Sequence, residues 1–552
     1  MEVPIIRTCN SLVALALASA AGSATAAIPL STYVEARAAE MNGDEARSAQ
    51  LFAMMAEADP KDLTIARRAI STAIQSGQSD LALSLAARLP AAELPVDARL
   101  LVAGDLLRRG KHKQAITALE QGETSTEVDL FAPLVKAWER TARGKKDGVE
   151  MLSKLPPSSP LGPVAPEQLA AMLFALGQTD QALAAAQKTL LQSGSGGRNV
   201  RLRLAYADSL LQAKRRDQAL EMLQGPDEAL IAARKRIAEG KRLGMALDTP
   251  AAGFAETLVA LAIELGRDEN KALPIALTQV ARRADPSNSE AAILLGLLLD
   301  GDGRSDDALA VLRSIPADDL LVGEALDVET RILGDRGDYA RALSRARGAT
   351  DVAGSTPQDF SRLANVLGDM DRHGEAAAAY GEAIERTVAA GGQPSWTLHL
   401  LRAASLEQAD RWNEAKAELE TAMKLEPDNA LLLNFLGYGK LERGEDLDAA
   451  EAMIRKASEL RPEDASITDS LGWALYKRGR LPEAIETLRR AAAGDHAQSE
   501  IHEHLGDALF SAGNRIEARF SWQAALVTAE DEAKARLERK IEAGLTPATA
   551  AP

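Results

Sequence analysis

Small and apolar residues recur along this chain with a period that is longer than one helix or strand. The clearest marker is a Leu-Gly pair that begins at Leu436, Leu471 and Leu505, positions 35 and then 34 residues apart. An alanine follows each pair at a nearly fixed distance, and a second alanine follows seven residues later. These alanines are Ala450 and Ala457, Ala484 and Ala491, and Ala518 and Ala525. Such a period predicts a repeated structure in which each repeat is one supersecondary unit.

The spacing inside each repeat predicts two antiparallel helices. An amphipathic helix buries an apolar stripe that it cannot cover alone, so a second helix packs on it. We expect Gly and Ala where the helices cross, because a larger side chain would hold the backbones apart. Gly479 and Gly513 mark turns between helices, and Pro427 and Pro462 follow the second helix. The expected fold is all-α, a right-handed α-solenoid superhelix of helix pairs.

The same register extends over most of the chain and predicts fourteen repeats, most of them separated by 33 to 35 residues. The residues at the second-helix position are Ser48, Ala82, Ala115, Val149, Ala182, Ala219, Pro274, Ala308, Ala342, Ala376, Ala415, Ala450, Ala484 and Ala518. Ser48, Val149 and Pro274 are the weakest matches. A register shared over this length is a strong signal of a repeat array.

Longer steps in the register divide the array. The longest step, of 55 residues, separates Ala219 from Pro274. We therefore expect an N-terminal array over 29–223, a basic helical extension with a loop over 224–254, and a C-terminal array over 255–530. A helix end and a disordered tail are expected over 531–552. The basic cluster at 234–242 is either a docking arm for an acidic partner or, as is more common, a solvated helix face.

Composition and charge narrow the classes of partner. Hydrophobic residues make up 46% of the chain but aromatic residues only 3%, so Ala and Leu dominate, which favours helices. The 64 Lys and Arg against 80 Asp and Glu give a formal net charge of −16. An acidic surface repels phosphate backbones and anionic lipid, so we expect no nucleic-acid partner. No later apolar stretch is long enough for a transmembrane segment.

The first residues have the layout of a secretory signal peptide. Arg7 is followed by the apolar run 12–21 and by a small-x-small site at 24–26. We therefore expect a signal peptide over 1–26 that is cleaved on export to the periplasm, although an ordinary leader or a misplaced start remains the alternative. Cys9, the single cysteine, precedes the apolar run, so a lipoprotein is not expected.

Sequence patterns that would indicate catalysis or metal binding are incomplete. His502 and His504 lie two residues apart and point about 200° apart on a helix, so we interpret them as surface histidines and not as a zinc pair. The run 300–303 resembles the start of a calcium loop, but Val311 occupies the position where that loop requires Glu. We expect no catalytic residue, metal or cofactor, and we interpret the chain as not being an enzyme.

The repeat pattern resembles that of the tetratricopeptide family, with Leu-Gly in a first helix, Ala in a second and Pro at the exit. The resemblance implies a groove lined by first helices that binds other proteins. Its groove positions map onto Asn434, Tyr438, Asp469, Trp473, Tyr476, Glu503, Asp507 and Phe510. Aromatic groups beside carboxylates are plausible anchors for an extended peptide or a helix. The alternative is that Trp473, Tyr476 and Phe510 pack between repeats.

The C-terminal third is also similar to secreted bacterial tetratricopeptide proteins, through the stretches 435–438, 469–476, 503–507 and 517–520. Some of these relatives are outer-membrane lipoproteins that recruit a processing protease to its substrates. The resemblance implies an envelope protease or its substrates as candidate partners, but this chain lacks a lipidation cysteine after the leader. The leading hypothesis is a non-enzymatic scaffold or adaptor in the bacterial cell envelope, and the alternative is a self-associating assembly factor.

Overall fold

The computed structural model describes residues 30–121, 131–155, 159, 161–194, 196–352, 354–495 and 497–551. These residues form thirty α-helices and one 3-10 helix, η1 (Ala91–Glu93), and contain no strand. The predicted all-α class is therefore confirmed. The expected signal peptide lies outside the described residues.

The chain divides into two compact units, one ending at Ile332 and the other beginning at Leu333. Most helices of unit 1 follow one another as pairs. The pairs are α1 (Leu30–Met41) and α2 (Glu45–Ala58), α3 (Leu63–Gln75) and α4 (Ser79–Ala86), α5 (Val96–Arg108) and α6 (His112–Glu120), α7 (Phe131–Ala142) and α8 (Asp147–Ser153), α9 (Ala165–Ala175) and α10 (Thr179–Gln192), α11 (Gly197–Gln212) and α12 (Arg216–Met222), α14 (Pro250–Leu265) and α15 (Ala272–Ala284), and α16 (Ser289–Gly301) and α17 (Ser305–Leu312). A single helix, α13 (Glu228–Ala238), and an irregular segment lie between α12 and α14.

The boundary between the units falls within α18 (Val322–Asp335). Unit 2 continues with α19 (Tyr339–Thr350) and then with further pairs. These are α20 (Pro357–Gly368) and α21 (His373–Ala389), α22 (Trp396–Gln408) and α23 (Trp412–Leu425), α24 (Ala430–Glu442) and α25 (Leu447–Leu460), α26 (Ala465–Lys477) and α27 (Leu481–Gly494), and α28 (Ser499–Ser511) and α29 (Arg515–Thr528), followed by α30 (Asp531–Ala543). Among the described residues, no helix is long and apolar enough to span a membrane.

The predicted register agrees with the structure at nearly every repeat. Each of the fourteen positions falls in the second helix of a pair, from Ser48 in α2 to Ala518 in α29. At twelve of these positions the exposed fraction is 0%. The repeat at Val149 is the exception, because the close crossing in α8 lies one residue earlier. A Cβ atom on Gly148 would lie 2.4 Å from the carbonyl oxygen of Ala137.

The glycine of each C-terminal Leu-Gly pair marks where two helices touch. A Cβ atom on Gly437 would lie 2.8 Å from Cγ1 of Ile454, and one on Gly472 would lie 2.5 Å from Cγ of Leu488. The same atom on Gly506 would lie 2.4 Å from Cδ1 of Trp522. Each partner belongs to the second helix of the same pair. The sequence-based explanation of the Leu-Gly period, a close helix crossing, is therefore confirmed at these three pairs.

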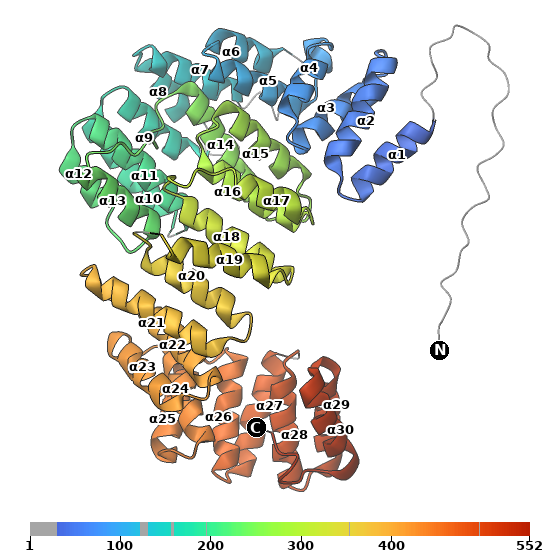
Figure 1. The fold of residues 1–552 in the computed structure, drawn as a ribbon, viewed down its shortest axis with the longest axis vertical. Helices are drawn as coiled ribbons and strands as arrows, with labels where there is room; N and C mark the ends of the chain where they lie inside the picture. Colours follow the sequence, from blue (N-terminus) through green and yellow to red (C-terminus); the bar gives the residue numbers. More distant parts are fainter. Residues whose placement is uncertain are drawn as a thin grey trace, which may run out of the picture. The chain divides into compact units, whose positions relative to one another are not determined.

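Unit 1 is more than a row of neighbouring pairs. Helices α14 and α15 pack against α3, α5, α7 and α9, which precede them by many residues, and Figure 1 shows α14 and α15 beside α5 and α7. The ring of Phe254 in α14 lies 5.7 Å from that of Phe131 in α7, edge to face. A Cβ atom on Gly104 in α5 would lie 3.2 Å from Cβ of Ala284 in α15. The returning helices therefore cover first-helix faces that a simple array would leave open.

A buried ionic cluster joins the returning helices to the array. Arg198 in α11 contacts Glu167 in α9 and Glu256 in α14, and its Nη1 lies 2.8 Å from Oε2 of Glu290 in α16. Nη2 of Arg201 lies 3.3 Å from Oε2 of Glu256, whose exposed fraction is 0%. Burial raises the pKa of Glu290 to about 7, although Arg198 opposes the shift. Burial would also raise the pKa of Glu256, but Arg201 and Arg198 hold it below its usual value.

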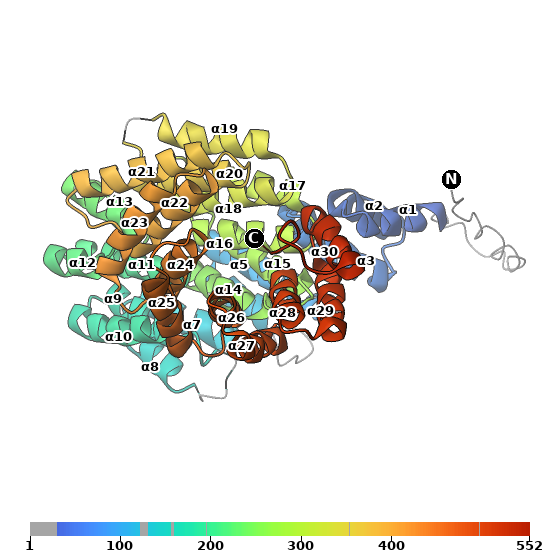
Figure 2. The ribbon, with the colours of Figure 1, turned by 90° about the horizontal axis from the view of Figure 1, so that it is seen from below.

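Unit 2 keeps the order expected of a linear array, because each of its pairs packs mainly against the next. Its first helices α24, α26 and α28 lie in succession (Figure 2), and α30 packs on α29. The segment after Gly544 differs from the disordered tail that the sequence predicted. The N–H of Ala551 donates to Oδ2 of Asp507 at 2.9 Å, and Ala551 is only 5% exposed. Apolar burial and this hydrogen bond hold the tail against unit 2.

Candidate protein-binding site

The eight residues predicted for the groove all lie on the first helices α24, α26 and α28. The structure brings three of them, Asn434, Tyr438 and Asp469, to the wall of one cavity of about 190 Å³. We call this cavity the α24–α28 pocket. Its lining comprises Glu407, Asn434, Phe435, Tyr438, Gly439, Ser466, Asp469, Ser470, Gln498 and Glu500.

Three carboxylates give the α24–α28 pocket its charge. Glu407 is partly neutralised by Arg443, whose Nη1 lies 3.2 Å from Oε1 of the carboxylate. The hydroxyl of Tyr438 donates to Oε1 of Glu500 at 3.5 Å. Burial, together with the charge of Glu500, raises the pKa of Tyr438 well above its usual value. The phenol therefore remains a protonated donor, and the pocket keeps an excess of negative charge.

Asp469 forms the buried part of this pocket. It is 5% exposed, and its Oδ2 lies 2.8 Å from Nδ1 of His504. Its other oxygen, Oδ1, is buried without a hydrogen-bond partner among the described residues, as is Oδ1 of Asn434. Both residues line the pocket. Because a buried acceptor without a donor is unfavourable, these two oxygens are available to donors of a bound group.

His504 is fully buried and is not the surface residue that the sequence indicated. Its ring stacks on Trp473, with the centroids 4.0 Å apart. Burial alone would lower the pKa of His504, but the carboxylate of Asp469 raises it above its usual value, with smaller contributions from Glu500 and Asp507. The imidazolium form is therefore stabilised beside the pocket.

Trp473 is buried and is not the exposed anchor that the sequence analysis considered. Its side chain is 1% exposed, and its Nε1–H donates to Oε1 of Glu442 at 2.8 Å. On its other side it stacks on Tyr476, with the centroids 4.7 Å apart. The hydroxyl of Tyr476 lies 3.1 Å from Oγ of Ser511 on the next first helix. Packing between repeats, the alternative considered for both residues, describes their contacts.

Glu503 and Asp507 also need a correction, because α30 covers them. Nζ of Lys540 lies 2.6 Å from Oε1 of Glu503 and 2.8 Å from both oxygens of Asp507, and Lys540 is fully buried. Arg536 adds two hydrogen bonds to Glu503, each of 2.8 Å. Burial would raise the pKa of Glu503, but Arg536 and Lys540 lower it below the usual value. These carboxylates are neutralised inside the chain.

Phe510 is covered from the same side. Its ring lies 5.4 Å from that of Trp522, and a Cβ atom on Gly544 would lie 2.7 Å from Cζ of Phe510. The predicted set therefore divides into three residues that line the α24–α28 pocket and five that pack within the chain or are covered by it.

Sequence reasoning missed Glu407, Gln498, Glu500 and Lys540. Glu500 precedes His504 by four residues, so a helical projection would have placed both on one face. Glu407 belongs to the preceding first helix, where the Leu-Gly marker is absent and the register is harder to assign. The contacts of Lys540 join α30 to α28 across 33 and 37 residues, and no local pattern indicates them.

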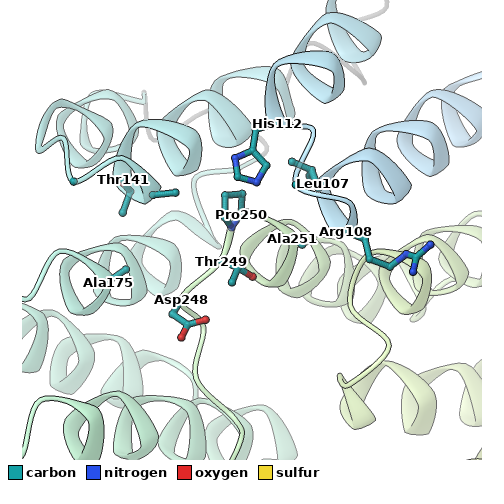
Figure 3. Close-up of a pocket in the computed structure, with 12 residues that line it drawn as sticks. Leu107, Arg108, His112, Thr141, Ala175, Asp248, Thr249, Pro250 and Ala251 are labelled. Atoms are coloured by element: carbon teal, nitrogen blue, oxygen red, sulfur yellow. The ribbon is translucent and has the colours of Figure 1, made fainter.

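A second cavity lies in unit 1, where the segment 248–251 meets the ends of α5, α7 and α9 (Figure 3). His112, Arg108 and Asp248 line it, but Arg108 and Asp248 do not converge on the His112 ring. Within the described ranges, no group of three or more His, Cys, Asp or Glu residues is arranged to hold a metal ion. This cavity therefore presents no cluster of groups comparable to the α24–α28 pocket.

Three solved structures are similar to the chain at low identity. The APC/C hetero-tetramer Cut9-Hcn1 is 14% identical, covering 94% of this chain and 96% of that one, with a TM-score of 0.37. A tetratricopeptide repeat protein from Parabacteroides merdae is 13% identical, covering 47% and 98%, with a TM-score of 0.39. YrrB, described as a TPR protein with an unusual peptide-binding site, is 21% identical, covering 33% and 91%, with a TM-score of 0.26. At these scores the likenesses carry no argument about the site.

Comparison with sequence families is more specific for the C-terminal part of the chain. No curated protein matches the sequence. A family model described as tetratricopeptide repeat matches residues 440–499 and 470–536, which together include the whole of α25 to α29 and the residues Asp469, Glu500 and His504. This match agrees with the resemblance to tetratricopeptide repeats that the Leu-Gly pairs of the C-terminal part indicated.

Proposed function

We propose that the chain is a non-enzymatic scaffold that binds partner proteins through the first-helix face of unit 2. The α24–α28 pocket is the point of contact, and an extended segment of the partner is the ligand. One observation carries the proposal: Asp469, which lines a cavity on first helices of a tetratricopeptide-like array, has a buried oxygen with no hydrogen-bond partner among the described residues. Repeat arrays of this class use such faces to bind other chains.

The proposal places the binding site where the chain does not cover itself. In unit 1 the returning helices α14 and α15 pack against α3, α5, α7 and α9. In unit 2 the end of the array is covered by α30, with Lys540 neutralising Glu503 and Asp507. The α24–α28 pocket of unit 2, by contrast, retains polar groups and a partly exposed tyrosine, which suit an extended peptide.

We further propose that the protein acts in the bacterial envelope, after export through the leader at 1–26. The support is the sequence of the leader alone. Fusing residues 1–30 to a reporter that is active only outside the cytoplasm tests this location. An inactive reporter would contradict the envelope location and would leave the binding proposal standing.

A peptide selection tests the binding function. Random twelve-residue peptides displayed on phage are selected on the purified full chain, and the affinities of enriched peptides are measured in solution. Tyr438→Ala should weaken their binding about tenfold, as expected for loss of an aromatic anchor. Tyr339→Ala is the matched control, since Tyr339 is a partly exposed tyrosine on α19 of the same unit.

Hydrogen exchange then locates the bound peptide. Protection should be confined to the end of α22, to α24 and α26, and to the start of α28. Protection elsewhere, or binding that Tyr438→Ala leaves unchanged, would show that the α24–α28 pocket is not the site.

A further inference from the structure

The charges of the α24–α28 pocket are graded from its rim to its floor. The Glu500 side chain is 62% exposed and stands at the rim, whereas the Asp469 side chain is 8% exposed and lies at the floor. The Glu407 side chain, at 26% exposed, is intermediate between these two in its exposed fraction. The positive groups that face these carboxylates are Arg443, on Glu407, and His504, on Asp469 and Glu500. Three carboxylates thus face two positive groups, so one negative charge remains in excess even when His504 is protonated.

The acceptors at the floor define the chemistry of the group that fits. Oδ1 of Asp469 and Oδ1 of Asn434 both require a donor. An anionic group would be repelled by the carboxylates. A neutral polar group could donate a hydrogen bond but would leave the net negative charge of the pocket uncompensated, which is unfavourable at low exposure.

The walls of the pocket suit a long side chain with an apolar stem. Phe435 and Tyr438 contribute rings, and Gly439 contributes only backbone. Lysine and arginine carry aliphatic stems that pack on such surfaces while the charged end reaches a polar group. A cation close to an aromatic face gains further electrostatic attraction.

We infer that the α24–α28 pocket binds the side chain of one lysine or arginine of the partner segment, with its donors on Asp469 and Asn434 at the floor and its stem against Phe435 and Tyr438. This inference rests on the proposed function and names the residue that the partner must present. The carboxylate of Glu500 attracts the cation at the rim, and Asp469 holds it at the floor. The pocket therefore distinguishes partners by the position of one basic residue.

Four pools of capped seven-residue peptides test this inference. The central residue is arginine, lysine, norleucine or glutamate, and the flanking positions are equal mixtures of Ala, Ser, Leu and Thr. Each pool is passed over the immobilised full chain, and retained peptide is quantified by mass spectrometry. The arginine or lysine pool should be retained about tenfold more than the norleucine pool, as expected for a charged hydrogen bond.

Variants assign the preference to the pocket. Glu500→Gln changes an exposed carboxyl and should lower the preference for the cationic pools several-fold. Asp469→Asn should lower it further, and the two together should abolish it. Glu486→Gln is the matched control, because Glu486 is an exposed residue of α27 outside the pocket, and it should leave the preference unchanged.

The outcomes separate the inference from the proposed function. Retention of the norleucine pool equal to that of the cationic pools, with loss on Tyr438→Ala, would overturn the inference and leave the binding function standing. A cationic preference that survives both pocket substitutions, or that falls equally in Glu486→Gln, would also overturn it. Retention of none of the pools would contradict the inference, whereas the function would still be judged by the selected peptides.

Discussion

Units 1 and 2 share one repeat register, but their first helices meet different surroundings. In unit 1, α14 and α15 lie against α3, α5, α7 and α9, and Glu256 of α14 is buried with Arg198 and Arg201 of α11. In unit 2, the face formed by α24, α26 and α28 retains a cavity, and α30 and the tail cover its end. The comparison teaches that a repeat pattern alone does not identify the open faces. Binding capacity depends on which faces the chain itself leaves uncovered.

The largest loss of stability should come from disrupting the buried ionic cluster that joins the returning helices to the array in unit 1. Arg198→Ala removes the cation shared by Glu167, Glu256 and Glu290, and leaves these three carboxylates of the buried cluster near Arg201 alone, which contacts only Glu256 among them. We expect unit 1 to lose about 3–5 kcal/mol of unfolding free energy. Hydrogen exchange at increasing denaturant should show the loss in α9, α11 and α14.

Arg267→Ala is the control in the same unit, because Arg267 is 72% exposed and pairs with the exposed Glu264. This substitution should change the unfolding free energy of unit 1 by no more than about 0.5 kcal/mol. Equal stability of the two variants would show that the ionic cluster does not hold the returning helices, and would remove the contrast between the units.

A smaller effect should follow from uncovering the end of unit 2. A chain shortened to Leu545 loses the N–H of Ala551 that donates to Asp507, together with the burial of Ala551. We expect a loss of about 1–2 kcal/mol, measured as faster hydrogen exchange in α28. Ala548→Ser, at an exposed position of the same segment, should leave exchange unchanged. Unchanged exchange in the shortened chain would mean that the tail contributes nothing to coverage.

The smallest effect on stability should be the pH dependence that the protonation of His504 gives to the unfolding free energy of unit 2. Because Asp469, Glu500 and Asp507 together raise its pKa above the usual value despite burial, the folded state binds the proton more tightly than the unfolded chain does. This stabilisation is fully present below about pH 6.5, the unfolded value, and is lost as the pH rises through the folded value. Denaturant unfolding at a series of pH values should show the decrease in unit 2.

His504→Gln should remove this dependence, whereas His502→Gln, on the same helix, should keep it. An NMR titration of the His504 ring that gives a pKa below the usual value would contradict the electrostatic description of the pocket floor.

The contacts inside each helix pair could be predicted from the sequence, because Gly and Ala at a crossing leave a local, periodic trace. Ala450 and Gly472 are examples, and the error at Val149 is one residue, where Gly148 makes the close approach. When one segment covers another that is distant in the chain, the sequence carries no such periodic pattern. Lys540 gives no local sign that it will neutralise Glu503 and Asp507, so residues assigned to the groove by their helical position proved to be covered. Asn434, Tyr438 and Asp469 instead line a cavity, and among the described residues α30 contributes nothing to its lining.

The return of α14 and α15 also sets an order for folding during synthesis. Arg304 donates to the carbonyl oxygen of Gln75 across 229 residues, and Arg283 reaches Asp105 across 178, so the N-terminal pairs emerge long before the helices that complete their core. Contacts of such long range are formed slowly, and the partly finished region exposes apolar surface in the interval. The later pairs of unit 2 can instead add one after another. We expect a chaperone to be needed most while the ribosome is between α5 and α15.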